Sequence, residues 1–341
     1  MGIRQNRFAL FVASVHARRA GNRQSWTVLA IVAPGQGAQT PGFLEPWVAD
    51  PKSASRLRWL SAVADLDLVH YGTTADADTI RDTAIAQPLL VAAGLLTSAA
   101  LFDEPDEADR LTGVSAGHSV GELTAAAFAG VLSPEQAMVL VRERGKAMAE
   151  ASAVAPTSMT AMVGGDRDEV LAAIEKHGLT AANNNGSGQI VAAGTTEQLA
   201  ALADDAPRRC RLVPLSVAGA FHTRHMAPAV AHLEQLAAAV TTEDPRIRLL
   251  SNADGQVVTD GAEVLQRIVG QVANPVRWDL CMETMLELGV TGLLELTPAG
   301  TLTGIAKRNL KGVELFTLNS PDQLTEAQDF VRRHGAGTEN S

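Results

Sequence analysis

The 341-residue sequence contains only two cysteines, Cys210 and Cys281, which lie far apart and form no Cys-x-x-Cys pair. Structural zinc sites and disulfide frameworks need several cysteines at close spacing, so neither is expected. Scarce cysteine is typical of proteins in a reducing compartment, and we expect a cytoplasmic location. Histidines and carboxylates also lack the spacing of metal ligands, so we expect no metal and no other cofactor.

Long apolar runs and a surplus of positive charge are missing as well. No segment approaches the roughly 18 apolar residues of a membrane-spanning helix, so no membrane span is expected. The formal net charge is −10, which argues against general binding to nucleic acid or to an anionic membrane. Hydrophobic residues make up 46% of the chain. The composition is therefore that of a globular protein with a sizeable core.

The two ends of the chain differ from the rest. Residues 1–26 contain five arginines and no acidic residue. A short apolar run at Phe8–Val15 leaves a signal or transit peptide open as an alternative, but no small-residue cleavage site closes it. We expect residues 1–26 to be a disordered extension, and residues 334–341 to be a disordered polar tail.

Between the ends, strand and helix signals alternate, which predicts an α/β fold with a parallel sheet. Residues 27–33 form a continuous apolar run that is typical of a buried strand. Residues 87–101 are rich in Ala and Leu and predict a buried helix with Pro88 in its first turn. Another helix is predicted from Pro134 to about Ala151, with Ser133 as its N-cap.

Residues 157–217 have a pattern of their own. Their strand and helix signals follow the order β-α-β-β-α-β, which is typical of a ferredoxin-like subdomain. We therefore predict a large α/β-hydrolase-like domain, made of residues 27–156 and 218–333, into which this small subdomain is inserted.

The segment Gly117-His118-Ser119-Val120-Gly121 matches the G-x-S-x-G pattern between a predicted strand and a predicted helix. In that context the serine sits on a strained turn, and the glycines let neighbouring backbone pass closely. Its hydroxyl projects at a helix N-terminus, where the dipole favours a developing oxyanion. Ser119 is therefore the candidate nucleophile, and the Val120 N–H is a candidate oxyanion-hole donor.

A second oxyanion donor and a base must come from other segments. The loop Gly35-Gln36-Gly37 ends the strand at residues 27–33, and we expect its Gln36 N–H to supply the other donor. A phosphate-binding loop is the rival interpretation, but no Gly-Lys-Ser/Thr follows. Of the eight histidines, His222 is the preferred base, because it lies among small residues at a junction between elements.

Arg144 lies on the predicted apolar face of its helix, together with Leu140, Val141 and Met148. A guanidinium on such a face is costly unless it is paired. An internal salt bridge is one explanation. The other is a bidentate clamp on a substrate carboxylate, a role that lysine reproduces poorly.

Five segments together resemble the malonyl-CoA:acyl-carrier-protein transacylase family, which includes the acyltransferase domains of fatty-acid and polyketide synthases. The likeness runs from about residue 28 to residue 311. The segments are Gly35-Gln36-Gly37-Ala38-Gln39, Gly117-His118-Ser119-Val120-Gly121-Glu122, Arg142-Glu143-Arg144-Gly145, Gly219-Ala220-Phe221-His222 and Asn274-Pro275-Val276-Arg277-Trp278.

The resemblance implies that Ser119 takes a malonyl group from malonyl-CoA, with His222 as base, and passes it to the phosphopantetheine thiol of acyl carrier protein. It also implies that the backbone carbonyl of Gln271 orients His222 and that Arg144 binds the malonyl carboxylate. Further positions are implied to line the cleft or to select malonyl: Gln87, Asn183, Asn185 and Phe221. A monomer is expected.

Two other function classes remain open. A serine esterase or thioesterase would share the G-x-S-x-G pattern, and Asp166, Asp168, Asp204 and Asp205 lie between Ser119 and His222 in the chain order of such hydrolases. A non-catalytic binding module is the third possibility, against which the Ser119, His222 and Arg144 set argues.

Overall fold

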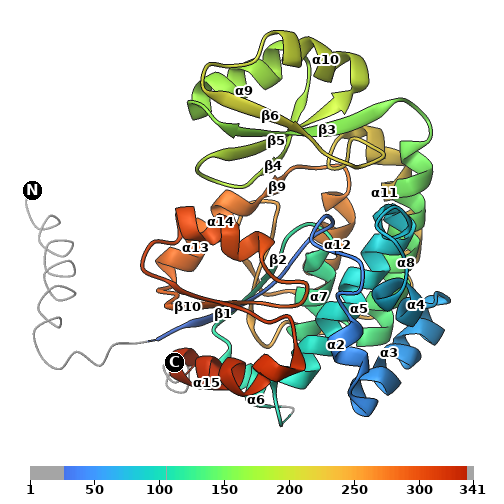
Figure 1. Ribbon diagram of the computed structural model, residues 1–341, viewed down its shortest axis with the longest axis vertical. Helices are drawn as coiled ribbons and strands as arrows, with labels where there is room; N and C mark the ends of the chain where they lie inside the picture. Colours follow the sequence, from blue (N-terminus) through green and yellow to red (C-terminus); the bar gives the residue numbers. More distant parts are fainter. Residues whose placement is uncertain (1–26, 105, 336–341) are drawn as a thin grey trace, which may run out of the picture.

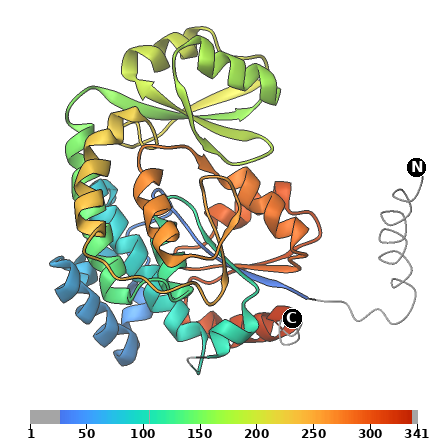
Figure 2. The same cartoon turned by 180° about the vertical axis from the view of Figure 1, so that it is seen from behind.

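The computed structural model describes residues 27–104 and 106–335. The extension expected at residues 1–26 lies outside this described part. Two lobes are visible: a large one built around a six-stranded sheet, and a small one with a five-stranded sheet (Figure 1). The same two lobes are seen from behind in Figure 2. This arrangement confirms the predicted α/β fold class.

The sheet of the large lobe is parallel except at one edge. Its strand order is β11-β10-β1-β2-β7-β8, and only the β7–β8 pair is antiparallel. The central strand β1 is buried along its whole length, as expected for a strand covered on both faces. The strands are β1 (Leu29–Ala33), β2 (Val114–Gly117), β7 (Arg248–Leu250), β8 (Val257–Val258), β10 (Gly292–Glu295) and β11 (Glu314–Thr317).

Two apolar cores lie on the two faces of this sheet. Alternate β1 residues divide between them: Ile31 belongs to one core, and Ala30 and Val32 belong to the other. The larger core contains residues of α5 (Thr83–Leu101), α7 (Gly121–Phe128), α8 (Pro134–Ser152), α11 (Ala227–Ala237), α12 (Gly261–Gln271) and α15 (Leu324–Gly335). The second contains residues of α13 (Trp278–Glu287) and α14 (Thr301–Asn309).

Seven further helices complete the described part of the large lobe. They are α2 (Glu45–Val48), α3 (Pro51–Ala64), α4 (Leu68–Thr73), η2 (Thr79–Arg81), α6 (Glu107–Leu111), η3 (Arg224–Met226) and η4 (Pro321–Gln323). Helices α2, α3 and α4 lie together at one side of the lobe, next to α5 and α8 (Figure 1).

The small lobe has the β-α-β-β-α-β element order that the sequence predicts. Its elements are β3 (Thr157–Gly164), α9 (Arg167–Lys176), β4 (Thr180–Asn184), β5 (Gln189–Thr195), α10 (Thr196–Asp204) and β6 (Cys210–Pro214). They form an antiparallel sheet in the order β6-β3-β5-β4. A fifth strand, β9 (Val276–Arg277), pairs parallel with β4. Because β9 comes from a later segment of the chain, it ties the small sheet to the large lobe.

Helix α5 differs from the prediction in two ways. It begins at Thr83, where Asp82 caps it by accepting a hydrogen bond from Ala84 N, so Pro88 lies inside the helix and not in its first turn. Contrary to the sequence-based expectation, α5 is also long and apolar enough to cross a membrane by length and composition. However, 78% of its most apolar window is buried inside the protein, as in the core helix of a globular protein.

The C-terminal tail begins later than expected. Helix α15 extends to Gly335, and His334 is buried within it, where its ring nitrogens bond Thr291 and Glu314. The prediction of a disordered segment from residue 334 is therefore wrong for its first two residues. The apolar stripe of α15 contains Ala327, Phe330 and Val331. Residues 336–341 lie outside the described part of the chain.

Candidate active site

Ser119 sits on the turn between β2 and α7 with a backbone φ of 53°. This left-handed conformation is strained for any residue with a side chain. A Cβ atom on Gly117 would lie 2.0 Å from the Gly121 carbonyl group, and one on Gly121 would lie 2.3 Å from the Ala33 oxygen. Gly117 is therefore needed for the turn to close on the start of α7, and Gly121 for the turn to pack against β1. The turn holds the serine hydroxyl at the start of α7.

His222 reaches Ser119 from a segment about a hundred residues further along the chain. Its Nδ1 lies 2.8 Å from the Gln271 carbonyl oxygen, which can only accept a hydrogen bond, so Nδ1 carries the proton. Its Nε2, 2.8 Å from Ser119 Oγ, is therefore the acceptor for the serine hydroxyl. His222 has a left-handed φ of 60°, so backbone strain is present at both members of the pair.

The environment of His222 favours the neutral ring. Burial, and after it the nearby Arg144 charge, lower its pKa from 6.5 to about 3. A neutral imidazole can accept a proton at pH 7. No carboxylate bonds His222 in the part of the chain that the structure describes.

Two of the four acids that could complete a hydrolase triad are engaged elsewhere. Asp166 caps α9, and Asp205 bonds Lys176 and His177 on the small lobe. His222 is thus oriented by a backbone carbonyl, as the family resemblance implies.

Arg144 projects from α8 and is only 2% exposed. Its Nη1 donates to Gln87 Oε1 at 2.6 Å and its Nη2 to Gln271 Oε1 at 2.8 Å, and Nη2 lies 3.5 Å from Ser119 Oγ. Burial lowers its pKa to about 10, so the group stays charged at pH 7. No ion pair to Arg144 occurs among the described residues, which removes the internal salt bridge as an explanation. A buried cation bonded only to neutral oxygens beside the candidate nucleophile is suited to receive an anion.

The loop after β1 lies directly against the serine turn. A Cβ atom on Gly35 would be 2.8 Å from the His118 carbonyl oxygen. The Gln36 side chain donates to Thr83 Oγ1 at 3.2 Å and accepts from Gln87 Nε2 at 3.4 Å. Within the described residues, neither the Gln36 N–H nor the Val120 N–H has a hydrogen-bond partner. Both groups are therefore available as oxyanion donors.

Of the remaining predicted residues, Asn185 is the one with a contact to the serine turn among the described residues. Asn185 places Oδ1 2.9 Å from His118 Nε2, so it links the small lobe to the serine turn. The buried Asn183 Oδ1 has no partner among the described atoms. Phe221 is buried in the larger core, and the selectivity role implied for it stays a prediction.

Three side-chain roles were not foreseen from the sequence. The Gln271 amide, the Glu122 carboxyl and the Asn252 amide form a buried network under Ser119. Asn252 Oδ1 accepts from Ser119 N at 2.8 Å. Glu122 could have been noticed, because it is an acidic residue in the otherwise apolar segment after the G-x-S-x-G pattern.

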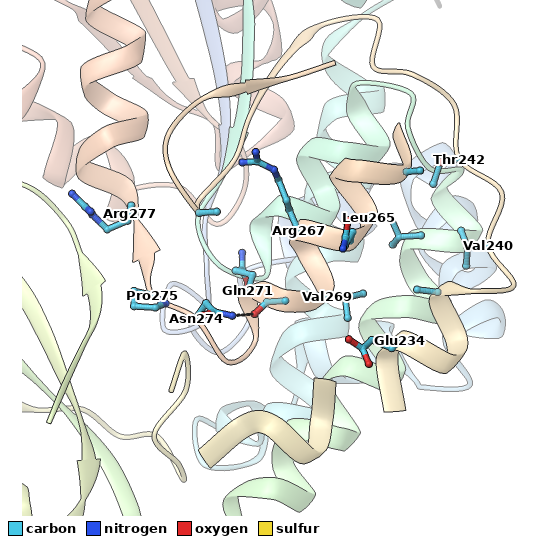
Figure 3. Close-up of a pocket in the computed structure, with 15 residues that line it drawn as sticks. Glu234, Val240, Thr242, Leu265, Arg267, Val269, Gln271, Asn274, Pro275 and Arg277 are labelled. Carbon is cyan, nitrogen blue, oxygen red and sulfur yellow. Dashed lines mark hydrogen bonds between the residues drawn. The ribbon is translucent and has the colours of Figure 1, made fainter. Parts of the chain in front are cut away.

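Cavities lie on two sides of the candidate site. One of about 390 Å³ is lined by Gln36, Gly37 and the chain returning from the small lobe at residues 215–217. Another, of about 870 Å³, lies between α11 and α12 and touches Gln271 and Asn274 (Figure 3). The larger cavity reaches Gln271, whose carbonyl oxygen bonds His222, but Ser119 does not line it. The described residues contain no cluster of three or more His, Cys, Asp or Glu that could hold a metal ion.

The chain matches the family described as acyl transferase domain over residues 22–329. The malonyl CoA-acyl carrier protein transacylase of Mycobacterium bovis is 48% identical over 299 residues, which cover 88% of this chain and 99% of that protein. The Escherichia coli protein of the same name is 32% identical over 312 residues, covering 89% and 100% of the two chains.

Solved structures agree with these matches. The crystal structure of MCAT from Mycobacterium tuberculosis has a TM-score of 0.85 at 47% identity, covering 88% of this chain and 99% of that one. A malonyl-transacylase in complex with its type II PKS acyl-carrier protein has a TM-score of 0.82 at 28% identity, covering 89% and 99%. The chain therefore belongs to the malonyl CoA-acyl carrier protein transacylase family of acyltransferases.

Proposed function

We propose that the protein transfers a malonyl group from malonyl-CoA to the phosphopantetheine thiol of acyl carrier protein, through an acyl-enzyme on Ser119. The observation that carries this proposal is the buried Arg144 charge, which has only neutral partners and lies 3.5 Å from Ser119 Oγ. A malonyl thioester has its carboxylate two bonds beyond the reacting carbonyl carbon. A carboxylate at this distance can pair with the Arg144 guanidinium while the thioester carbonyl carbon lies at Ser119 Oγ.

The first half-reaction forms the acyl-enzyme. His222 Nε2 takes the Ser119 hydroxyl proton as Oγ attacks the thioester carbonyl. The N–H groups of Gln36 and Val120 stabilise the oxyanion. The C–S bond then breaks, and the proton on His222 passes to the departing coenzyme A thiolate.

The second half-reaction uses the same groups to remove the malonyl group from Ser119. The thiol of the phosphopantetheine arm gives its proton to His222 and attacks the malonyl ester. The C–O bond to Ser119 breaks, and Oγ recovers the proton from His222. Chemistry supplied by a cofactor is not required in either half, and the substrates are the two thioester carriers.

Burial supports transfer to a thiol over hydrolysis. His222 is 2% exposed and Arg144 equally little, so bulk water has little access to the base. Exclusion of water protects an acyl-enzyme between its formation and the arrival of the thiol. The free cysteines are compatible with the reducing cytoplasm, which we propose as the location, and we expect a monomer.

Two exposed basic clusters are candidates for docking the acidic carrier protein. One is Arg208, Arg209 and Arg211, before and within β6, and the other is Lys307, Arg308 and Lys311, on and after α14. We favour the α14 cluster, because Arg308 lines a cavity of about 290 Å³ that also touches Asn185. Asn185 in turn bonds His118 in the serine turn, so this cluster lies beside a path towards Ser119.

One assay tests the proposed function directly. The protein is incubated with malonyl-CoA labelled in the malonyl group and with holo acyl carrier protein. We expect label on the carrier protein, and a stoichiometric label on the wild-type protein when carrier protein is left out. Label released mainly as free malonate in the presence of carrier protein would instead establish a thioesterase, and no labelled protein at all would contradict the acyl-enzyme.

A further inference from the structure

Glu122 is a buried carboxyl group that the proposed reaction does not use. It lies on α7, three residues after Ser119, and is 5% exposed. Its Oε1 accepts a hydrogen bond from Asn252 N at 2.6 Å, and its Oε2 accepts one from Gln271 Nε2 at 2.5 Å. Its pKa is raised to about 7, because burial outweighs the lowering effect of the two hydrogen bonds and of the Arg144 charge. An isolated acid at this depth needs an explanation, because its burial costs free energy.

The contacts of the Gln271 side chain supply that explanation. Its Nε2 faces three acceptors: Glu122 Oε2, the Ser119 carbonyl oxygen at 2.9 Å and Asn252 Oδ1 at 3.2 Å. Its Oε1 therefore faces Arg144 Nη2 at 2.8 Å. The opposite orientation would place an NH₂ group against the guanidinium donors and an oxygen against a carboxylate. The amide has one favourable orientation, which two charged groups select: Glu122 accepts from its nitrogen, and Arg144 donates to its oxygen.

We infer that Glu122 is a positioning residue: by fixing the Gln271 amide, it holds Arg144 beside Ser119 with its charge free for a substrate carboxylate. This inference rests on the proposed function and adds a determinant of malonyl selectivity to it. Gln271 then has two separate tasks, since its main-chain carbonyl orients His222 and its side chain places Arg144.

The charges around Glu122 are consistent with this role. Arg144 on α8 attracts it without forming an ion pair, because both carboxyl oxygens are occupied by N–H donors. Arg267 on α12 also attracts it, but bonds Asp254 and Glu263. The Cys281 thiol on α13 is kept protonated, because burial raises its pKa well above the usual value. Glu122 thus offsets the buried Arg144 charge from a distance and leaves the guanidinium accessible.

The decisive variant is Glu122→Gln, which keeps the size of the side chain. Its amide can accept from only one of the two N–H donors and turns an NH₂ group towards the other, so the Gln271 amide loses its fixed orientation. We expect kcat/KM for malonyl-CoA to fall roughly tenfold or more, while kcat/KM for acetyl-CoA changes less than about threefold. A role in stability alone would lower both values together.

Glu295 provides a matched control. It is also buried, but among the described residues it accepts only from the N-terminal end of α14, at Gly300, Leu302 and Thr303. We expect Glu295→Gln to lower the melting temperature and to leave the malonyl-to-acetyl ratio of kcat/KM unchanged.

A second measurement needs only the wild-type protein, in case the variant does not fold. Both Glu122 oxygens act as acceptors, so protonation replaces one acceptor by a donor and weakens the hold on Gln271. The ratio of kcat/KM for malonyl-CoA to kcat/KM for acetyl-CoA should therefore rise as the pH increases through about 7. Titration of the coenzyme A moiety affects both values equally, so it cancels in the ratio. In this range His222 stays neutral and Arg144 stays charged.

Different results would contradict the proposed function and the role of Glu122. A wild-type protein that transfers no malonyl group would contradict the proposed function. A wild-type protein that transfers malonyl with a pH-independent ratio, or a folded Glu122→Gln protein that keeps the wild-type ratio, would overturn the role of Glu122 and leave the proposed function standing.

Discussion

Arg144 Nη2 lies 3.5 Å from Ser119 Oγ, and the Gln271 side chain bonds both the Arg144 guanidinium and the Ser119 main chain. The guanidinium is bonded by the Gln271 side-chain oxygen, and the serine carbonyl oxygen accepts from the Gln271 amide nitrogen. The distance between a charge and a nucleophile is thereby fixed by one side chain. Such pre-organisation reduces the cost of orienting a substrate whose carboxylate and reacting carbonyl must be bound together.

Removing the guanidinium should change the choice of substrate more than the chemistry. In Arg144→Ala we expect kcat/KM for malonyl-CoA to fall by one to two orders of magnitude, roughly the effect of losing charge-assisted hydrogen bonds. Acetyl-CoA has no carboxylate, so its transfer should persist or increase. Steady-state assays with both substrates measure this. Arg142→Ala is the matched control, because Arg142 pairs with Glu143. An equal loss of both activities in a folded Arg144→Ala protein would contradict the clamp.

The left-handed backbone at Ser119 should be visible in stability measurements. Ser119→Ala and Ser119→Gly both remove the nucleophile and should both be inactive. Glycine adopts a φ of 53° without strain, so Ser119→Gly should be more stable than Ser119→Ala by about 1 kcal/mol in the free energy of unfolding.

Ser98 is the control for this comparison, because it lies inside the regular helix α5. There the order should reverse, with Ser98→Gly less stable than Ser98→Ala by about 1 kcal/mol. Denaturant titration of the four variants measures both differences. Equal stability of the two Ser119 variants would show that the turn stores no strain.

The sequence predicts the parts of this site that depend on local pattern. The serine turn follows from Gly117 and Gly121 on either side of it, and the placement of Arg144 follows from helical periodicity and its apolar neighbours. These signals lie within a few residues of the groups they describe, so no knowledge of the tertiary fold is needed to read them.

Contacts between distant segments could not be read in this way. The Gln271 amide meets Glu122 from 149 positions away, and the pairing of β9 with β4 joins two short strands with little pattern of their own. Helix α5 shows the same limit, since Asp82 sets its start and its tertiary packing accommodates Pro88 inside the helix. Nothing local fixed either feature, so the boundary was predicted four residues too late.

The depressed pKa of His222 predicts a pH dependence of stability. An unfolded histidine takes up a proton near pH 6.5, whereas the folded one does so only near 3. Between these values the unfolded state binds more protons, so the stability is lost as the pH falls. The free energy of unfolding of the wild-type protein, minus that of His222→Gln, should therefore decrease from pH 7 to pH 4. Subtraction removes the other titrating groups, and a constant difference would show that the ring is solvated.

Charge reversal next to the cavity at Asn185 should separate carrier-protein docking from acylation. We expect the double substitution Lys307→Glu and Lys311→Glu to raise KM for acyl carrier protein roughly tenfold at low salt, because complementary charge mainly affects encounter. Arg308 lines the cavity and is left unchanged, so formation of the malonyl-enzyme from malonyl-CoA should be unaffected. The difference should shrink as salt screens the exposed charges. The same charge reversal at Arg208 and Arg209 serves as the comparison. A larger rise in KM for acyl carrier protein in that variant would assign docking to the small lobe. An unchanged KM in both variants would exclude both clusters.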